Sequence, residues 1–120
     1  MAHDDLDVIV YKVLAYILAC AKADVRPSAA KAKEAAKAND TLWAMAVQSM
    51  LDEGLVTGVE VTYYYHELGK PTVSESPAIG ITLKGQQYLR DNSKMREIAA
   101  FLGQAFADML PHLVSATQAL

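Results

Sequence analysis

The amino-acid sequence predicts a mainly α fold that carries one small antiparallel β-hairpin, which places it in the α+β class. Two observations lead to this expectation. Apolar residues recur at helical spacing through the first half of the chain. Just after Gly54 that rhythm changes to strict alternation, which is typical of a strand. The chain has 120 residues, 52% of them hydrophobic, so we expect one domain spanning residues 1–120.

Three helices are expected in the first half of the chain. The first covers about residues 5–23 and ends before a proline, because a residue that precedes proline avoids the helical region. The second, about 28–38, begins at Ser28, a good N-cap, and is built on alanine, which favours helix but buries little area. The third, about 41–53, ends at Gly54, which suits the left-handed position after a helix.

The second half of the chain is expected to hold the hairpin and two more helices. In the first strand Val59, Val61 and Tyr63 share the inward face, and a polar loop with several turn residues follows. Pro111 is expected to end or bend the last helix. The elements are a hairpin of about residues 56–66 and 78–81, helices of about 83–91 and 93–110, and a tail over 111–120.

Three helices followed by a two-stranded wing form the winged helix-turn-helix arrangement, here with an extra C-terminal helix. In members that bind DNA, the third helix enters a groove of the duplex. The order of elements therefore predicts a winged-helix fold and makes the third helix the first candidate for a functional surface.

Three runs of residues carry a family resemblance. They are LDEGLVTGV at residues 51–59, ITLKGQQYL at residues 81–89 and YKVLAYIL at residues 11–18. Together they resemble the YjcQ family, small proteins of Gram-positive bacteria and their prophages, over roughly Asp5 to Leu110. The resemblance implies a winged-helix fold and no established activity, so it supplies no catalytic or binding residues. The alanine-rich second helix and the segment after Pro111 depart from the family pattern.

No residue pattern points to catalysis, to a metal or to a cofactor. Cys20 continues the apolar stripe of the first helix, and a free cysteine in such a place is usually part of the core. The histidines His3, His66 and His112 lie too far apart in sequence for metal-ligand spacing. The glycines are isolated or lie in turns and do not form a phosphate-binding loop. We expect a protein that is not an enzyme, with no catalytic residue, no metal and no cofactor.

The N-terminal residues, the longest apolar stretch and the number of cysteines indicate where in the cell the protein is expected. The chain opens with acidic residues, whereas a secretory signal opens with basic ones. Its longest apolar stretch, residues 8–21, is interrupted by Lys12 and is too short to span a bilayer. A single cysteine excludes an internal disulfide. We therefore expect a cytoplasmic protein that does not interact with membranes.

Double-stranded DNA is the first candidate partner. The formal net charge is −3, and residues 40–53 hold three acids and no Lys or Arg, so phosphate contacts must come from neighbouring elements. The alternative for Lys33 and Lys37, in the second predicted helix, is that they only keep this alanine-rich helix soluble. Ser49 is a further hydrogen-bonding side chain on the third helix. The candidate base-reading residues are Thr41, Ala44, Met45 and Gln48, and the candidate phosphate contacts are Lys33, Lys37 and Lys70.

A protein partner is the second candidate, with the winged-helix scaffold serving as an interaction module that does not bind nucleic acid. The acidic third helix, the negative net charge and exposed aromatic residues favour it. The aromatic run Tyr63–Tyr65 could stack on bases, although tyrosine is common in strands and two of the three are expected to pack inward.

The last predicted helix carries a seam of apolar residues at heptad spacing, about two heptads long. Such a seam is too short for an independent coiled coil but is long enough to extend a packed dimer. The alternative is that this helix packs on the first helix of its own chain. We expect a homodimer through this helix, and the candidate interface residues are Met95, Ile98, Leu102, Ala105 and Met109.

Overall fold

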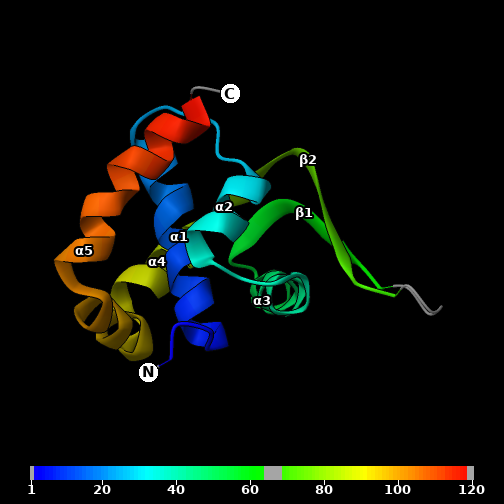
Figure 1. Ribbon diagram of the computed structural model, residues 1–120, viewed down its shortest axis with the longest axis horizontal. Helices are drawn as coiled ribbons and strands as arrows, with labels where there is room; N and C mark the ends of the chain where they lie inside the picture. The colour runs from blue at the N-terminus through cyan, green and yellow to red at the C-terminus, as the bar shows by residue number, and fades with distance from the viewer. Residues whose placement is uncertain (1, 64–68, 119–120) are drawn as a thin grey trace.

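The other elements pack around a central helix, α1 (Leu6–Lys22), as Figure 1 shows. The computed structural model describes residues 2–63 and 69–118. Within them the further elements are α2 (Ala29–Ala36), α3 (Asp40–Asp52), β1 (Val56–Thr62), β2 (Thr72–Ile81), α4 (Leu83–Asp91) and α5 (Ser93–Gln118). The prediction of a mainly helical α+β fold with one antiparallel hairpin is confirmed, and the arrangement is that of a winged helix with an extra C-terminal helix.

Helix α1 is buried on nearly all sides. Ile9, Leu14 and Tyr16 have no exposed surface, and the helix contacts α2, α3, α4, α5 and β2. A helix that is apolar around most of its circumference is stable only when other elements cover it. This explains why buried apolar residues occur around most of the circumference of α1 and not on one stripe alone.

Side-chain caps fix the starts of the shorter helices. Ser28 accepts a hydrogen bond from the backbone N–H of Lys31, and Thr82 accepts one from Gly85 at 2.9 Å. Asn39 accepts a bond from Leu42 at 2.8 Å, so α3 begins one residue earlier than predicted. Each cap meets a backbone donor that has no partner inside its helix.

The hairpin differs from its predicted limits. Strand β1 ends at Thr62 instead of residue 66, and residues 64–66 lie outside the described part of the chain. The expectation that Tyr63 packs inward is wrong, because the residue is 46% exposed. Strand β2 begins at Thr72, six residues before the predicted start. The polar segment 72–77, which was expected to be a loop, is therefore part of this strand.

A bulge bends the base of the wing. Thr57 pairs with Gly80, but Val59 pairs with Glu75, so residues 76–79 of β2 lie opposite Gly58 alone. Gly58 has a φ of +78°, a conformation that L side chains rarely adopt. The bulge explains why strict alternation of apolar residues does not continue through β2.

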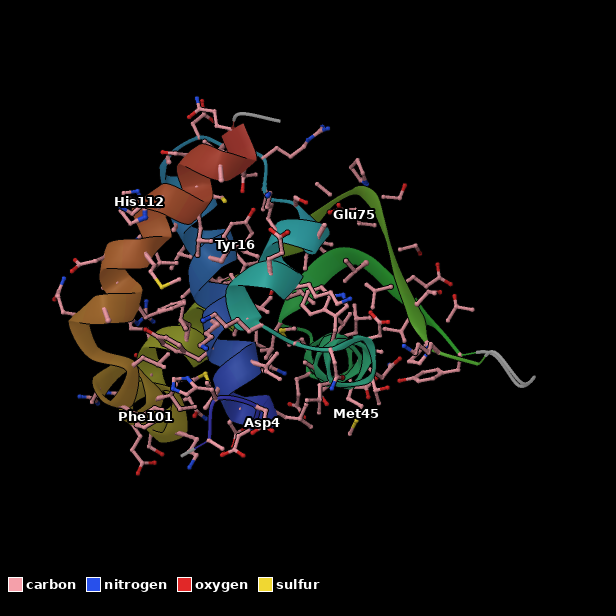
Figure 2. The ribbon with its side chains drawn as sticks, in the orientation of Figure 1. Asp4, Tyr16, Met45, Glu75, Phe101 and His112 are labelled. Carbon is pink, nitrogen blue, oxygen red and sulfur yellow. The ribbon has the colours of Figure 1, made fainter. Side chains whose placement is uncertain are left out.

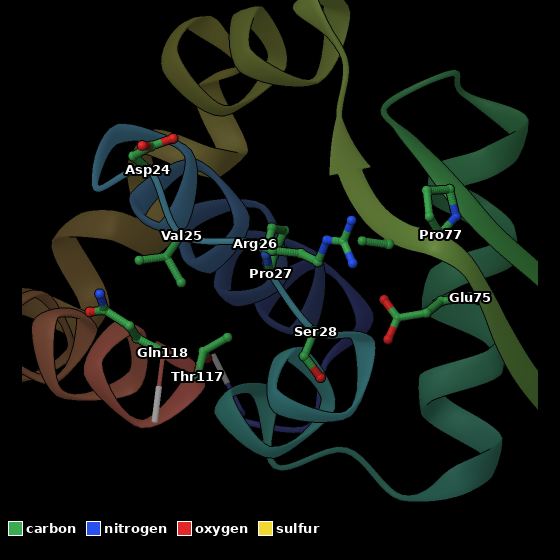
Figure 3. A pocket seen from close by; sticks show the side chains of 10 residues that line it. Asp24, Val25, Arg26, Pro27, Ser28, Glu75, Pro77, Thr117 and Gln118 are labelled. Carbon is green, nitrogen blue, oxygen red and sulfur yellow. The ribbon is translucent and has the colours of Figure 1, made fainter. Parts of the chain in front are cut away.

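Glu75 ties this bulge to the start of α2. Its carboxylate accepts hydrogen bonds from the backbone N–H of Ala29 at 3.1 and 3.2 Å and from that of Ile79 at 2.9 Å. Figure 3 shows the Glu75 side chain reaching from β2 toward Ser28. A negative charge at a helix N-terminus is favourable, so this residue fixes the angle at which the wing leaves the helices.

Replacing Glu75 by alanine is expected to lower the free energy of unfolding by about 1 to 2 kcal/mol, because two backbone donors lose their acceptor. Urea denaturation followed by circular dichroism measures the change. The matched control is Glu60→Ala on the exposed face of β1, which should change stability by less than about 0.5 kcal/mol. Equal effects of the two substitutions would contradict the role given to Glu75.

Helix α5 is longer than predicted and is broken in the middle. Gly103, with φ 65° and ψ −157°, is not helical, and the helix resumes and runs through Pro111 to Gln118. The expected tail over 111–120 is therefore wrong as far as residue 118. Val114 and Thr117 are buried in contact with the rest of the chain, and this tertiary packing holds the last turns where local sequence favours an end.

One of the described helices, α5, is long and apolar enough to cross a membrane by length and composition alone. The break at Gly103 divides it into two parts, and neither part reaches the roughly 20 residues that a span needs. The break would also place unpaired backbone groups in hydrocarbon, which is costly. This helix therefore gives no positive sign of a membrane protein.

Candidate nucleic-acid interface

The outward face of α3 is narrower than predicted. Thr41 is exposed, Met45 is 44% exposed and Gln48 is half-buried, and Figure 2 shows Met45 pointing away from the body of the molecule. Ala44 has no exposed surface, so its predicted role in reading bases is wrong. Helix α3 packs against α1 as well as both strands, so a large part of its circumference is covered.

The side chains that remain on this face are polar or flexible. Ser49 and Asp52 are exposed beside Gln48, whose side-chain amide donates a hydrogen bond to Asp52 Oδ1 at 2.9 Å. Gln48 therefore keeps its amide oxygen and its second N–H available for a partner. The face can form hydrogen bonds with a ligand, but it carries no positive charge of its own.

A three-charge cluster lies at the start of α3 and consists of Lys33, Asp40 and Lys70. Lys33 of α2 donates a hydrogen bond to Asp40, and Lys70 Nζ lies 3.8 Å from the other carboxylate oxygen of Asp40. The hydrogen bond from Lys33, its charge and the charge of Lys70 hold the pKa of the Asp40 carboxyl below its usual range. The cluster connects α2, α3 and the segment that leads into β2, and its net charge is +1.

The third predicted phosphate contact, Lys37, lies elsewhere. It is the C-cap of α2 with a left-handed backbone, φ 54° and ψ 38°. Burial lowers the pKa of Lys12 on α1, and the charge of Lys37 lowers it further. Lys37 lines a different cavity from the one that Lys33, Asp40 and Lys70 border. The structure thus brings Lys33 and Lys70 together and separates Lys37 from them, which spacing along the chain cannot reveal.

The predicted dimer seam is not a continuous surface. Met95 and Ile98 are fully buried against their own chain, so they offer no area to a partner, and their assignment to an interface is wrong. Leu102 is partly buried, whereas Ala105 and Met109 are exposed, and the break at Gly103 lies between these two groups. A homodimer through α5 stays a prediction, supported now only by the second half of the helix.

The residues considered for catalysis have ordinary surroundings. Cys20 is fully buried in the core, as expected, and burial raises the pKa of its thiol. A raised pKa disfavours the thiolate that a nucleophile requires. Residues 2–63 and 69–118 contain no group of three His, Cys, Asp or Glu side chains placed to hold a metal ion.

Comparison with known proteins identifies a family. The family model described as YjcQ protein matches residues 11–104, from the first turns of α1 to the residue after the break in α5. Neither the curated proteins nor the solved structures contain a match to this chain. The second half of α5 lies outside the matched region, which ends six residues before the expected limit at Leu110, whereas the alanine-rich α2 lies within it. Because the match covers most of the sequence, the chain belongs to the YjcQ family.

Proposed function

We propose that this protein is a non-enzymatic winged-helix regulator that binds double-stranded DNA in the cytoplasm and acts on phage or host genes. The observation that carries the proposal is the position of the Lys33–Asp40–Lys70 cluster. It lies where α2, α3 and the wing meet, beside the exposed polar face of α3. In a winged helix these are the elements that face the duplex.

In this proposal the contacts divide into two kinds. Thr41, Gln48 and Ser49 offer hydrogen bonds to base edges, and Met45 offers an apolar contact for a thymine methyl group. Lys33 and Lys70 contact phosphates and set the position of the helix. The side chain of Lys70 is 78% exposed, so it can turn from Asp40 to a phosphate at small cost.

The acidic residues of α3 set a limit on affinity. Asp40, Asp52 and Glu53 face a polyanion without any compensating Lys or Arg on the same helix. Two lysine–phosphate contacts release few counterions, so binding should be weak and should fall as salt increases.

A protein partner is the second candidate, and the acidic character of α3 is the observation that favours it. The same surface combines carboxylates with the exposed Met45, and a basic partner with a small apolar pocket would complement it. The carboxylate of Asp40 would weaken the binding of DNA but would favour a basic protein partner. The experiment below therefore removes this charge and measures the affinity for DNA.

Asparagine at position 40 is expected to tighten the binding of a mixed-sequence DNA duplex. The substitution Asp40→Asn removes a carboxylate that competes with phosphate for Lys33 and Lys70, and it should lower the Kd about three- to tenfold at low salt. Fluorescence anisotropy of a labelled duplex measures the change.

The matched control for this experiment is Asp108→Asn on the exposed side of α5, where the carboxylate accepts a bond from Gln104 at 2.8 Å. It alters net charge equally and should leave the Kd unchanged within about twofold. If wild type and Asp40→Asn both fail to bind any duplex at low salt, the DNA proposal is wrong and a basic protein partner becomes the better account.

A further inference from the structure

A cavity of about 350 Å³ lies among α1, α2 and α5, and no residue of α3 or of the wing lines it. It is bordered by Lys12 of α1, by the end of α2 and by residues of α5 on both sides of the break at Gly103. This volume is at the lower end of the range typical for small-molecule sites. The lining residues are His3, Lys12, Ala35, Lys37, Leu102, Ala105, Phe106 and Met109.

Lys12 is the unusual residue of this cavity. It is only 5% exposed, although lysine is almost never fully buried without a partner. No hydrogen bond or ion pair connects its ammonium to any residue in the described part of the chain. No side-chain nitrogen in that part is both fully buried and unpaired, so the ammonium is accessible from the cavity. None of the residues that line the cavity is acidic. Burial lowers the pKa of Lys12, and the nearby positive charge of Lys37 lowers it further.

The rest of the wall is apolar. Leu102, Phe106 and Met109 come from α5, and the ring of Phe106 lies 5.9 Å from that of Tyr11, which holds it in place. The ammonium groups of Lys12 and of the exposed Lys37 repel each other beside this apolar wall, and an anion between them removes that repulsion. The arrangement is therefore complementary to a molecule with one negative group and an apolar body.

We propose that this cavity binds a small monocarboxylate with an apolar tail. The carboxylate lies between Lys12 and Lys37, and the tail lies along Leu102, Phe106 and Met109. A nucleotide or sugar fits less well, because beyond the two lysines and His3 the wall has no side chain that can form hydrogen bonds. The site is independent of the DNA proposal, although Lys37 stands only two residues before Asn39, the N-cap of α3.

Octanoate is a suitable probe, and isothermal titration calorimetry on the full chain measures its binding. Wild type should bind octanoate, and the neutral analogue octanol should bind about tenfold more weakly, because it lacks the charge that Lys12 and Lys37 recognise. Lys12→Met should lower the affinity for octanoate by about tenfold or more, since methionine fills the same space without a charge.

Two further variants keep the test decisive. Lys84→Met removes an exposed lysine of α4 and should leave octanoate binding unchanged. Ala105→Phe fills the cavity from an exposed position of α5 without altering either lysine, and it should also abolish binding. Thermal unfolding of Lys12→Met should show a Tm equal to or above that of wild type, which separates loss of binding from loss of folding.

Three results would overturn the proposal. The first is wild type that takes up no octanoate, and the second is Lys12→Met that binds it as wild type does. The third is a dimer, seen by light scattering, that Lys12→Met dissociates, because the cavity would then hold an acidic side chain of a second copy. None of these results bears on the anisotropy measurement with DNA, so the two proposals fail separately.

Discussion

Alanine in place of Gly58 is expected to lower the free energy of unfolding by about 3 kcal/mol or more. A Cβ atom at this position would overlap the carbonyl oxygen of Ala78 and lie 2.8 Å from its carbonyl carbon. Both are backbone atoms of the bulge in β2, so relief would require the wing to shift. The φ of +78° adds strain that an alanine avoids elsewhere in the chain.

Gly54→Ala is the control that separates strain from collision. Gly54 has a similar φ of +71°, but the nearest atom to its added Cβ would be the flexible end of Lys84 at 3.9 Å. This substitution should therefore cost only about 1 kcal/mol, the usual amount for alanine in a left-handed position. Urea denaturation of both variants measures the difference, and equal losses would show that the close approach at Gly58 does not determine the stability of the wing.

The helical part of this fold could be predicted because its signals are local. Ser28 and Thr82 cap helices in the structure as their residue types indicate, and Gly54 takes the positive φ that suits a helix end. Apolar spacing then located the buried faces of α1 and α3. Each of these signals depends on residues within one or two turns of each other.

The wing was harder to predict because contacts with residues far away in sequence determine which of its residues form a strand. Residues 74–77 are polar and include a proline, a composition typical of a loop. In the structure Glu75 bonds to Ala29, which is far away in sequence, and β1 supplies the pairing that makes the segment a strand. No periodicity within the segment itself carries that information.

The candidate interface was predicted only in part for a similar reason. The structure keeps Thr41, Met45 and Gln48 on the accessible side of α3, but Ala44 is covered because α3 packs on two sides. An alanine is small enough for either environment, so its type gives no indication. Similarly, Lys33 and Lys70 both contact Asp40. They can do so only because the fold brings α2, α3 and the segment before β2 together.

Phenylalanine in place of Tyr16 is expected to lower the free energy of unfolding by about 2 kcal/mol. The hydroxyl of Thr117 donates to the carbonyl of Leu113 at 2.9 Å, so in the 2.6 Å contact between the two hydroxyls it is Tyr16 that donates. Tyr16 in turn accepts the N–H of Ser28 at 3.2 Å. The substitution removes a bond that joins α1 to the end of α5, and it leaves the N–H of Ser28 without an acceptor.

The effect of this substitution should depend on pH. Burial raises the pKa of Tyr16 from 10.0 to about 12, although the hydrogen bond that its oxygen accepts from the backbone N–H of Ser28 acts in the opposite direction. Because the unfolded chain loses this proton first, the contribution of Tyr16 is complete below pH 10 and is lost as the pH rises toward 12. The stability gap between wild type and Tyr16→Phe, measured by urea denaturation, should therefore narrow across that range by about 2 kcal/mol.

Burial also raises the pKa values of Tyr11 and Tyr88. Both residues are present in wild type and in Tyr16→Phe, so their contributions cancel when the two stabilities are subtracted. Any change in the difference between the two proteins then belongs to Tyr16 and its partners. A gap that stays constant through this range would mean that the hydroxyl ionises as readily in the folded protein as in the unfolded chain. The raised pKa of Tyr16, and with it the pH dependence of the link between α1 and the last turn of α5, would then be wrong, whereas the loss of stability in Tyr16→Phe would still measure the hydrogen bonds of the hydroxyl.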